Sequence, residues 1–186
     1  MKILAFMASG TEDSELIGTL SLLQRAKIDR LLISVEDSLT LKGSHGNTIV
    51  CDGLLSSYSV KQLLDYDGLF IPGGKRGVDT MKNTPKLLEL IKEYSKRGKP
   101  ITSICAGPTV LSKAGIMEGV SFTCYDGFEK EIPEGCYVVK APVVRDKNII
   151  TARSVAYVSE FGLDIIKYLL SDIEYDRVKH SILKED

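Results

Sequence analysis

A cysteine stands where a predicted strand changes into a predicted helix. Residues 101–104 (Ile-Thr-Ser-Ile) are predicted to form a buried strand, Cys105 follows, and Gly107-Pro108 begins a helix. This order is similar to that of a nucleophile on a sharp strand-to-helix turn, as in G-x-S-x-G enzymes, with Ser103 in the place of the first glycine. A helix N-terminus would lower the thiol pKa and favour the thiolate. Cys105 could equally be one more buried core thiol, and the pattern alone does not decide between the two.

Two other predicted strand ends carry residues that could act with this thiol. Glu15 lies in the first helical turn after the first strand, and Gly73-Gly74 end another strand. Glu15 could be a solvated first-turn acid, the commoner case, or a protonated carboxyl group that donates a hydrogen bond to Cys105 and lowers its pKa. Gly73 and Gly74 could form only a turn, or could supply backbone N–H groups that make an oxyanion hole together with that of Ala106.

The elements that must position these residues alternate between strand and helix. Apolar runs predict strands at residues 3–7, 31–35, 49–51, 68–71 and 101–104, and a later hairpin that pairs 137–139 with 148–150. One predicted helix, opened by Thr84-Pro85, has an apolar face made of Leu87, Leu90, Ile91 and Tyr94. This alternation predicts an α/β fold with a mostly parallel sheet covered on both faces. Since ligands of such sheets bind at the carboxyl ends of the strands, we expect the three strand ends above to form one site.

Composition limits the classes of protein that remain. The chain has 186 residues, with 24 Lys+Arg against 25 Asp+Glu and a net charge of −1, and 44% of its residues are hydrophobic. We therefore expect one domain over residues 1–186, with a short charged and helical tail from about residue 172. The net charge close to zero argues against nucleic acid or an anionic membrane as partner. No apolar stretch approaches the ~20 residues that span a bilayer. The N-terminal apolar run is too short for a secretory signal and is interpreted as the first strand. Because the cysteines indicate no disulfide scaffold, a reducing cytoplasm is the expected location.

The cysteines and histidines do not suggest a metal site or a disulfide framework. Cys51, Cys105, Cys124 and Cys136 show no CxxC spacing, and the chain has only two histidines.

Three motifs together carry a resemblance to a known family. Glu12-x-x-Glu15, Ile71-Pro72-Gly73-Gly74 and Ile104-Cys105-Ala106-Gly107-Pro108 occur in an order and spacing that resembles the ThiJ/PfpI superfamily, and within it the branch of the parkinsonism-associated protein. The stretch from Thr151 to Arg153 also fits. The resemblance implies a flavodoxin-like three-layer sandwich of the class I glutamine amidotransferase kind, a homodimer, no cofactor, a reactive Cys105 and a neighbouring Glu15, with Arg153 as an auxiliary residue.

The same resemblance implies two kinds of function. One is a cofactor-free glyoxalase or deglycase that acts on small aldehydes or glycated substrates through Cys105. The other is a redox sensor or chaperone in which Cys105 is oxidised to the sulfinate without obligatory turnover.

The sequence departs from the family at three positions. The protease-like branch has a histidine after the cysteine, whereas this chain has Ala106, so we do not expect a peptidase. Cys124 stands where the nearer branch often has a histidine, which argues against a Cys–His general base. Cys124 could be a resolving thiol, but a small hydrophobic residue is the favoured interpretation. His45 stands where many relatives have arginine, and could be a donor to an anionic ligand or an exposed loop residue. His180, in the charged tail, is expected to be solvated.

Overall fold

The first strand is apolar on both of its faces, and this dictates a layered structure. In the computed structural model, which describes residues 1–183, β1 (Lys2–Met7) sends Leu4 and Phe6 into one apolar cluster, and Ile3, Ala5 and Met7 into another. Because successive side chains of a strand point to opposite faces, both faces of β1 must be covered by other elements. The prediction of a buried strand at residues 3–7 is confirmed.

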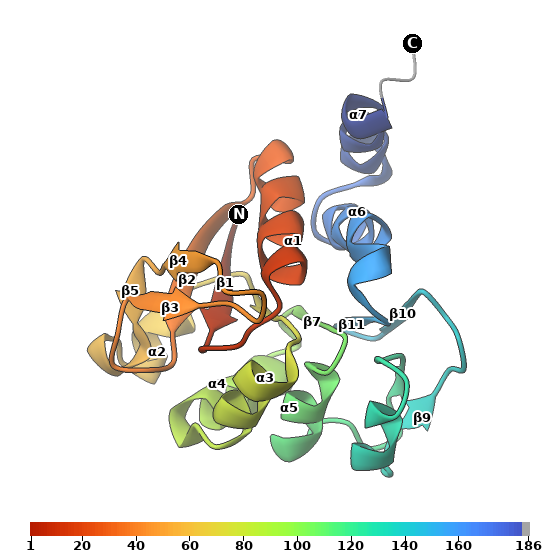
Figure 1. The fold of residues 1–186 in the computed structure, drawn as a ribbon. Coiled ribbons are helices and arrows are strands. Elements are labelled where there is room, and N and C mark those ends of the chain that lie inside the picture. Colours follow the sequence, from red (N-terminus) through yellow and green to blue (C-terminus); the bar gives the residue numbers. More distant parts are fainter. Residues whose placement is uncertain (184–186) are drawn as a thin grey trace.

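A seven-stranded sheet separates these two clusters (Figure 1). Its order is β10-β11-β7-β6-β1-β2-β5, and every neighbouring pair is parallel except β10 with β11. The other strands of this sheet are β2 (Asp29–Ser34), β5 (Gly53–Leu54), β6 (Gly68–Ile71), β7 (Ile101–Ile104), β10 (Val143–Asp146) and β11 (Ile149–Ala152). The predicted α/β fold with a mostly parallel central sheet is therefore confirmed.

Helices cover both faces of the sheet (Figure 1). One face carries α1 (Asp13–Arg25) and α6 (Val158–Leu169), with α7 (Asp172–Leu183) packed on α6. The other carries α2 (Val60–Leu63), α3 (Lys75–Lys82), α4 (Pro85–Lys96) and α5 (Pro108–Lys113). Three short 3-10 helices occur at η1 (Leu55–Ser57), η2 (Phe128–Glu131) and η3 (Val155–Tyr157). The arrangement is the predicted three-layer sandwich.

One predicted strand pairing is wrong, and one predicted strand lies outside the main sheet. The run at residues 49–51 does not join the main sheet, because β4 (Thr48–Val50) pairs antiparallel with β3 (Thr40–Lys42), and β5 takes the place beside β2. The strand at 148–150 pairs with β10 and not with 137–139, since the two-residue loop Lys147-Asn148, with Lys147 at φ 53°, makes a tight hairpin. β9 (Cys136–Tyr137) pairs instead with β8 (Ser121–Phe122).

The charged tail is helical as far as the structure describes it. α7 begins at Asp172 and buries Val178, while His180 is exposed, as predicted. The last three residues of the predicted tail, 184–186, lie outside the described part of the chain. Across residues 1–183, every helix is too short or too polar to cross a bilayer.

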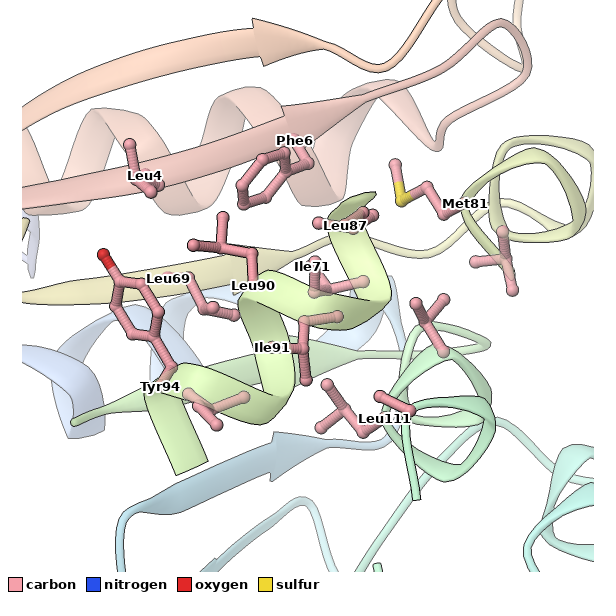
Figure 2. Packing of buried hydrophobic residues seen from close by; sticks show 14 of the residues in the cluster. Leu4, Phe6, Leu69, Ile71, Met81, Leu87, Leu90, Ile91, Tyr94 and Leu111 are labelled. Atoms are coloured by element: carbon pink, nitrogen blue, oxygen red, sulfur yellow. The ribbon is translucent and has the colours of Figure 1, made fainter. Parts of the chain in front are cut away.

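The predicted apolar face of α4 packs onto the sheet (Figure 2). Leu87, Leu90, Ile91 and Tyr94 are fully buried, as their spacing predicts. Figure 2 shows this face directed toward the residues of β1 and β6, which are Leu4, Phe6, Leu69 and Ile71. The Tyr94 hydroxyl donates to the Leu63 carbonyl at 2.8 Å, so the ring is buried without leaving its polar group unpaired.

Replacing Leu90 by Ala should destabilise the fold, because it leaves a cavity between α4 and the sheet. We expect Leu90→Ala to lower the free energy of unfolding by about 2–5 kcal/mol. The matched change Lys92→Ala, at an exposed position of the same helix, should alter it by less than about 0.5 kcal/mol. Urea unfolding followed by circular dichroism measures both. Equal midpoints for the two variants would contradict the packing described above.

Candidate functional site

Cys105 sits on a sharp turn directly after β7. Its backbone has φ 63°, a left-handed conformation that is unusual for a residue other than glycine. Its N–H donates to the Ala152 carbonyl at 2.9 Å, and its carbonyl accepts from the N–H of Tyr125 at 3.0 Å. The side chain is half-buried, so the thiol is neither enclosed nor freely solvated. Such strained backbone persists only where the surroundings hold it, and it is common at active sites.

Glu15 points into the protein from the first turn of α1. It is only 1% exposed, and its carboxyl group lies beside the Cys105 thiol, above Gly73. The carboxyl also accepts from the N–H of Gly73 at 3.0 Å. The side chain of Glu12, which caps α1, accepts from the N–H of Glu15 and so fixes the start of the helix. The structure therefore places the predicted acid beside the predicted nucleophile.

Gly73 and Gly74, which follow β6, form the floor of the site beneath Cys105 and Glu15. A Cβ atom at Gly73 would collide with Oε2 of Glu15 and lie 2.6 Å from Cβ of Cys105, so no larger residue fits. Gly74 has φ 90°, and its N–H and that of Ala106 are near enough to the Cys105 sulfur to favour its thiolate form. Of the three predicted oxyanion donors, Gly74 and Ala106 face the sulfur, whereas the N–H of Gly73 is directed at Glu15.

The order of strands in the sheet explains why these residues meet. β11, β7, β6 and β1 are consecutive neighbours, and Arg153, Cys105, Gly73 and Glu15 each follow one of them. Because parallel strands end at the same edge of the sheet, the residues after them gather there. The predicted convergence of three strand ends is what the structure shows.

Burial has the largest effect on the pKa values of Glu15 and Cys105. Burial raises the pKa of the Glu15 carboxyl to about 7, and the charge of Glu12 adds to the rise. Burial also raises the pKa of the Cys105 thiol, as does the negative charge of an ionised Glu15, while the N–H groups of Ala106 and Gly74 oppose the rise. The predicted lowering of the thiol pKa is therefore wrong, because loss of hydration outweighs the backbone donors. Near neutral pH the thiol keeps its proton, and an ionised Glu15 carboxylate is placed to accept that proton.

The other predicted residues lie around this centre. The imidazole of His45 is exposed, with Nδ1 at 3.4 Å from Oε1 of Glu12 and from Oδ2 of Asp13, so its contacts are with the acids at the start of α1. Cys124 is fully buried in the apolar cluster under α3, α4 and α5, whereas Cys105 packs against the cluster on the other face. Burial raises the pKa of Cys124 to about 12. These features favour the small hydrophobic role for Cys124 over a resolving thiol.

Arg153 pairs with Asp126, a residue that the sequence did not single out. Nε of Arg153 donates to Oδ1 of Asp126 at 3.1 Å and Nη2 to Oδ2 at 2.6 Å. The backbones of Tyr125 and Val155, which bond Cys105 and Glu15 respectively, were also missed. Backbone contacts leave no signal in residue type, and a single acid in a turn is indistinguishable from an ordinary surface residue.

Replacing Glu15 by Gln should remove a pH-dependent loss of stability. A carboxyl group whose pKa is raised in the folded state, here to about 7, contributes stability below its unfolded pKa of about 4.3, and this is lost as the pH rises through about 7. Between about pH 5 and about pH 8 we expect the unmodified protein to lose about 2 kcal/mol of unfolding free energy that Glu15→Gln does not lose.

Urea unfolding at the two pH values measures this difference. Glu89→Gln, at an exposed position of α4, is the control and should keep the pH dependence of the unmodified protein. The same pH dependence in Glu15→Gln would contradict a buried carboxyl with a raised pKa.

Comparison with known proteins identifies relatives over most of the chain. The chain is 30% identical over 170 residues to Protein DJ-1 homolog B of Arabidopsis thaliana, an alignment that covers 91% of this chain and 38% of that protein. It is also 30% identical over 170 residues to a deglycase of Pyrococcus horikoshii, covering 91% of this chain and 99% of that protein. With the Parkinson disease protein 7 homolog of Danio rerio the identity is 27% over 187 residues, 100% of this chain and 98% of that protein.

The fold is shared with a solved structure of the same group. The structure of oxidized DJ-1 from Toxoplasma gondii has a TM-score of 0.91 at 27% identity, and covers 98% of this chain and 97% of that chain. The model of the DJ-1/PfpI family matches residues 1–168. With the fold, the three strand-end motifs and this match in agreement, the chain belongs to the DJ-1/PfpI family.

Proposed function

We propose that this protein acts on small reactive carbonyl compounds, as a cofactor-free glyoxalase or deglycase in which Cys105 is the nucleophile. The observation that carries the proposal is a half-buried thiol on strained backbone, in contact with a buried carboxyl group and two backbone N–H groups. The name of the Pyrococcus relative, a deglycase, supports the same class of substrate. A homodimer stays a prediction from the family resemblance, and a cytoplasmic location stays a prediction from the sequence.

The geometry supports a specific sequence of steps with an aldehyde such as methylglyoxal. The sulfur of Cys105 forms a bond to the aldehyde carbon, the thiol proton passes to Glu15, and the carbonyl π electrons become an alkoxide that takes up a proton to give a hemithioacetal. Glu15 then moves a proton from this carbon to the neighbouring carbonyl carbon through an enediol, which leaves a thioester. Water hydrolyses the thioester to lactate and restores the thiol, so the balance is one methylglyoxal and one water to one lactate.

The residues around the sulfur each have a role in these steps. A carboxyl group with a pKa of about 7 exchanges protons efficiently near neutral pH, which suits Glu15 to a transfer in both directions. The N–H groups of Gly74 and Ala106, which surround the sulfur, are in place to stabilise negative charge on an oxygen bound near it.

The proposal predicts the effect of two substitutions on lactate formation. Cys105→Ser should abolish lactate production from methylglyoxal, and Glu15→Gln should slow it by about 10²–10⁴-fold, the usual contribution of a general acid or base. Cys136→Ser, which removes an exposed thiol, is the matched control and should be as active as the unmodified protein. Equal rates for Cys105→Ser and the unmodified protein would rule the proposal out.

A second candidate function is a redox sensor that uses the same thiol. A peroxide oxidises a thiol in two steps, each of which transfers one oxygen to sulfur and releases water or the corresponding alcohol, to give the sulfinate. The carboxyl of Glu15 and the N–H groups of Gly74 and Ala106 could donate hydrogen bonds to the sulfinate oxygens, since they already contact the sulfur. The Toxoplasma relative has itself been solved in an oxidized form.

Mild peroxide treatment tests this second function. Mass spectrometry should find two added oxygens on Cys105 before any on Cys136, although Cys136 is the more exposed thiol. In Glu15→Leu the preference for Cys105 should diminish, because the side-chain donor to the product is lost. Oxidation of Cys136 or Cys51 ahead of Cys105 in the unmodified protein would eliminate the redox function.

A further inference from the structure

Two segments that flank Cys105 are tied together by an ion pair. Arg153 follows β11, and Asp126 lies in the loop after β8. The guanidinium contacts both carboxylate oxygens, at 3.1 and 2.6 Å, and the hydroxyl of Tyr137 donates to Oδ1 of Asp126 at 3.4 Å. A two-point contact of this kind fixes orientation as well as distance.

The residues next to this pair bond the backbone of Cys105 on both sides. The N–H of Cys105 donates to Ala152, the residue before Arg153, and the carbonyl of Cys105 accepts from Tyr125, the residue before Asp126. These links make a closed ring of two backbone hydrogen bonds, two peptide bonds between consecutive residues and one ion pair. We name it the Cys105 ring, and its members are Cys105, Ala152, Arg153, Asp126 and Tyr125.

The ring acts on the one residue of the site that is held in an unfavourable conformation. Cys105 has φ 63°, and a residue in this region relaxes unless its neighbours prevent it. Ala152 belongs to the sheet, whereas Tyr125 lies in a loop outside it. The position of Tyr125 therefore depends on the contacts that its loop makes. One of these contacts is the ion pair of Asp126 with Arg153, which joins the two side chains at two points.

We infer that the Arg153–Asp126 pair positions Cys105, by closing this ring and so aiming the sulfur at Glu15 and at the N–H groups of Gly74 and Ala106. Arg153 and Asp126 are positioning residues, since they act through the backbone of Tyr125 and Ala152. The consequence for catalysis rests on the proposed function, but the consequence for the reactivity of the thiol does not.

Two other roles for the pair lead to different expectations. A role in stability alone is disfavoured, because the Asp126 side chain is 63% exposed and exposed ion pairs contribute little to folding. A direct effect of charge on the thiolate would make removal of Arg153 and removal of Asp126 act in opposite directions. Positioning makes them act in the same direction, because either change opens the ring.

The test is the rate at which iodoacetamide, an uncharged reagent, alkylates Cys105 near neutral pH in the full-length protein. We expect Arg153→Ala and Asp126→Ala each to slow this reaction about tenfold, the order of effect that a small displacement of a reacting group produces. The double variant should be no slower than either single one. Asp126→Glu, which keeps the carboxylate, should restore most of the rate.

Internal and matched controls accompany these variants. Cys136, an exposed thiol, should react at an unchanged rate in every variant. Arg30→Ala removes a different surface ion pair, with Asp52, and should leave Cys105 unaffected. If Arg153→Ala does not fold, Arg153→Lys replaces it, and an intermediate rate is expected because one contact point remains.

Three results would overturn the inference. These are rate changes of opposite sign in Arg153→Ala and Asp126→Ala, no change in either, or a failure of Asp126→Glu to restore the rate. Absence of lactate formation by the unmodified protein, together with the expected alkylation rates, would reject the proposed function and leave the positioning role intact.

Discussion

The left-handed backbone of Cys105 is the constraint on which the rest of the site depends. For a residue with a Cβ this conformation is unfavourable by about 1–2 kcal/mol, and it is kept because both backbone polar groups of Cys105 are bonded to neighbouring segments. The turn brings the thiol back toward β6 and β1, where Gly73 leaves room for it and Glu15 approaches from α1. With an extended backbone at this position, the sulfur would not lie beside the carboxyl group of Glu15.

The sheet supplies this geometry through its topology. Four consecutive strands end at one edge, and the segment after each of them carries a residue of the site or of the Cys105 ring. The strands themselves are held by apolar side chains on both faces, so the polar groups of the site rest on a rigid support. Reacting groups are placed more accurately on such elements than on loops.

The features that sequence predicted well are those with a local physical cause. The apolar run of β1 and the buried face of α4 follow from periodicity, because burial on two faces or on one helical stripe leaves a repeating pattern. The convergence of Cys105, Gly73 and Glu15 followed from the rule that parallel strands end together.

The features that sequence missed depend on partners that are distant in the chain. The run at residues 49–51 is apolar enough for a strand, but nothing local says that it pairs with β3 and not with the main sheet. The thiol pKa depends on how deeply the turn is buried, and the expected effect of the helix was smaller than that of burial. Asp126 becomes meaningful only when the loop brings it to Arg153.

The floor and the rim of the site differ in how much variation they tolerate. The floor, where an added methyl group at Gly73 would collide with both reacting side chains, tolerates no variation, whereas the loop at residues 44–47 is open to solvent. Divergence among proteins built on this plan should therefore accumulate at the rim, so that new substrates can be recruited to one unchanging reaction centre.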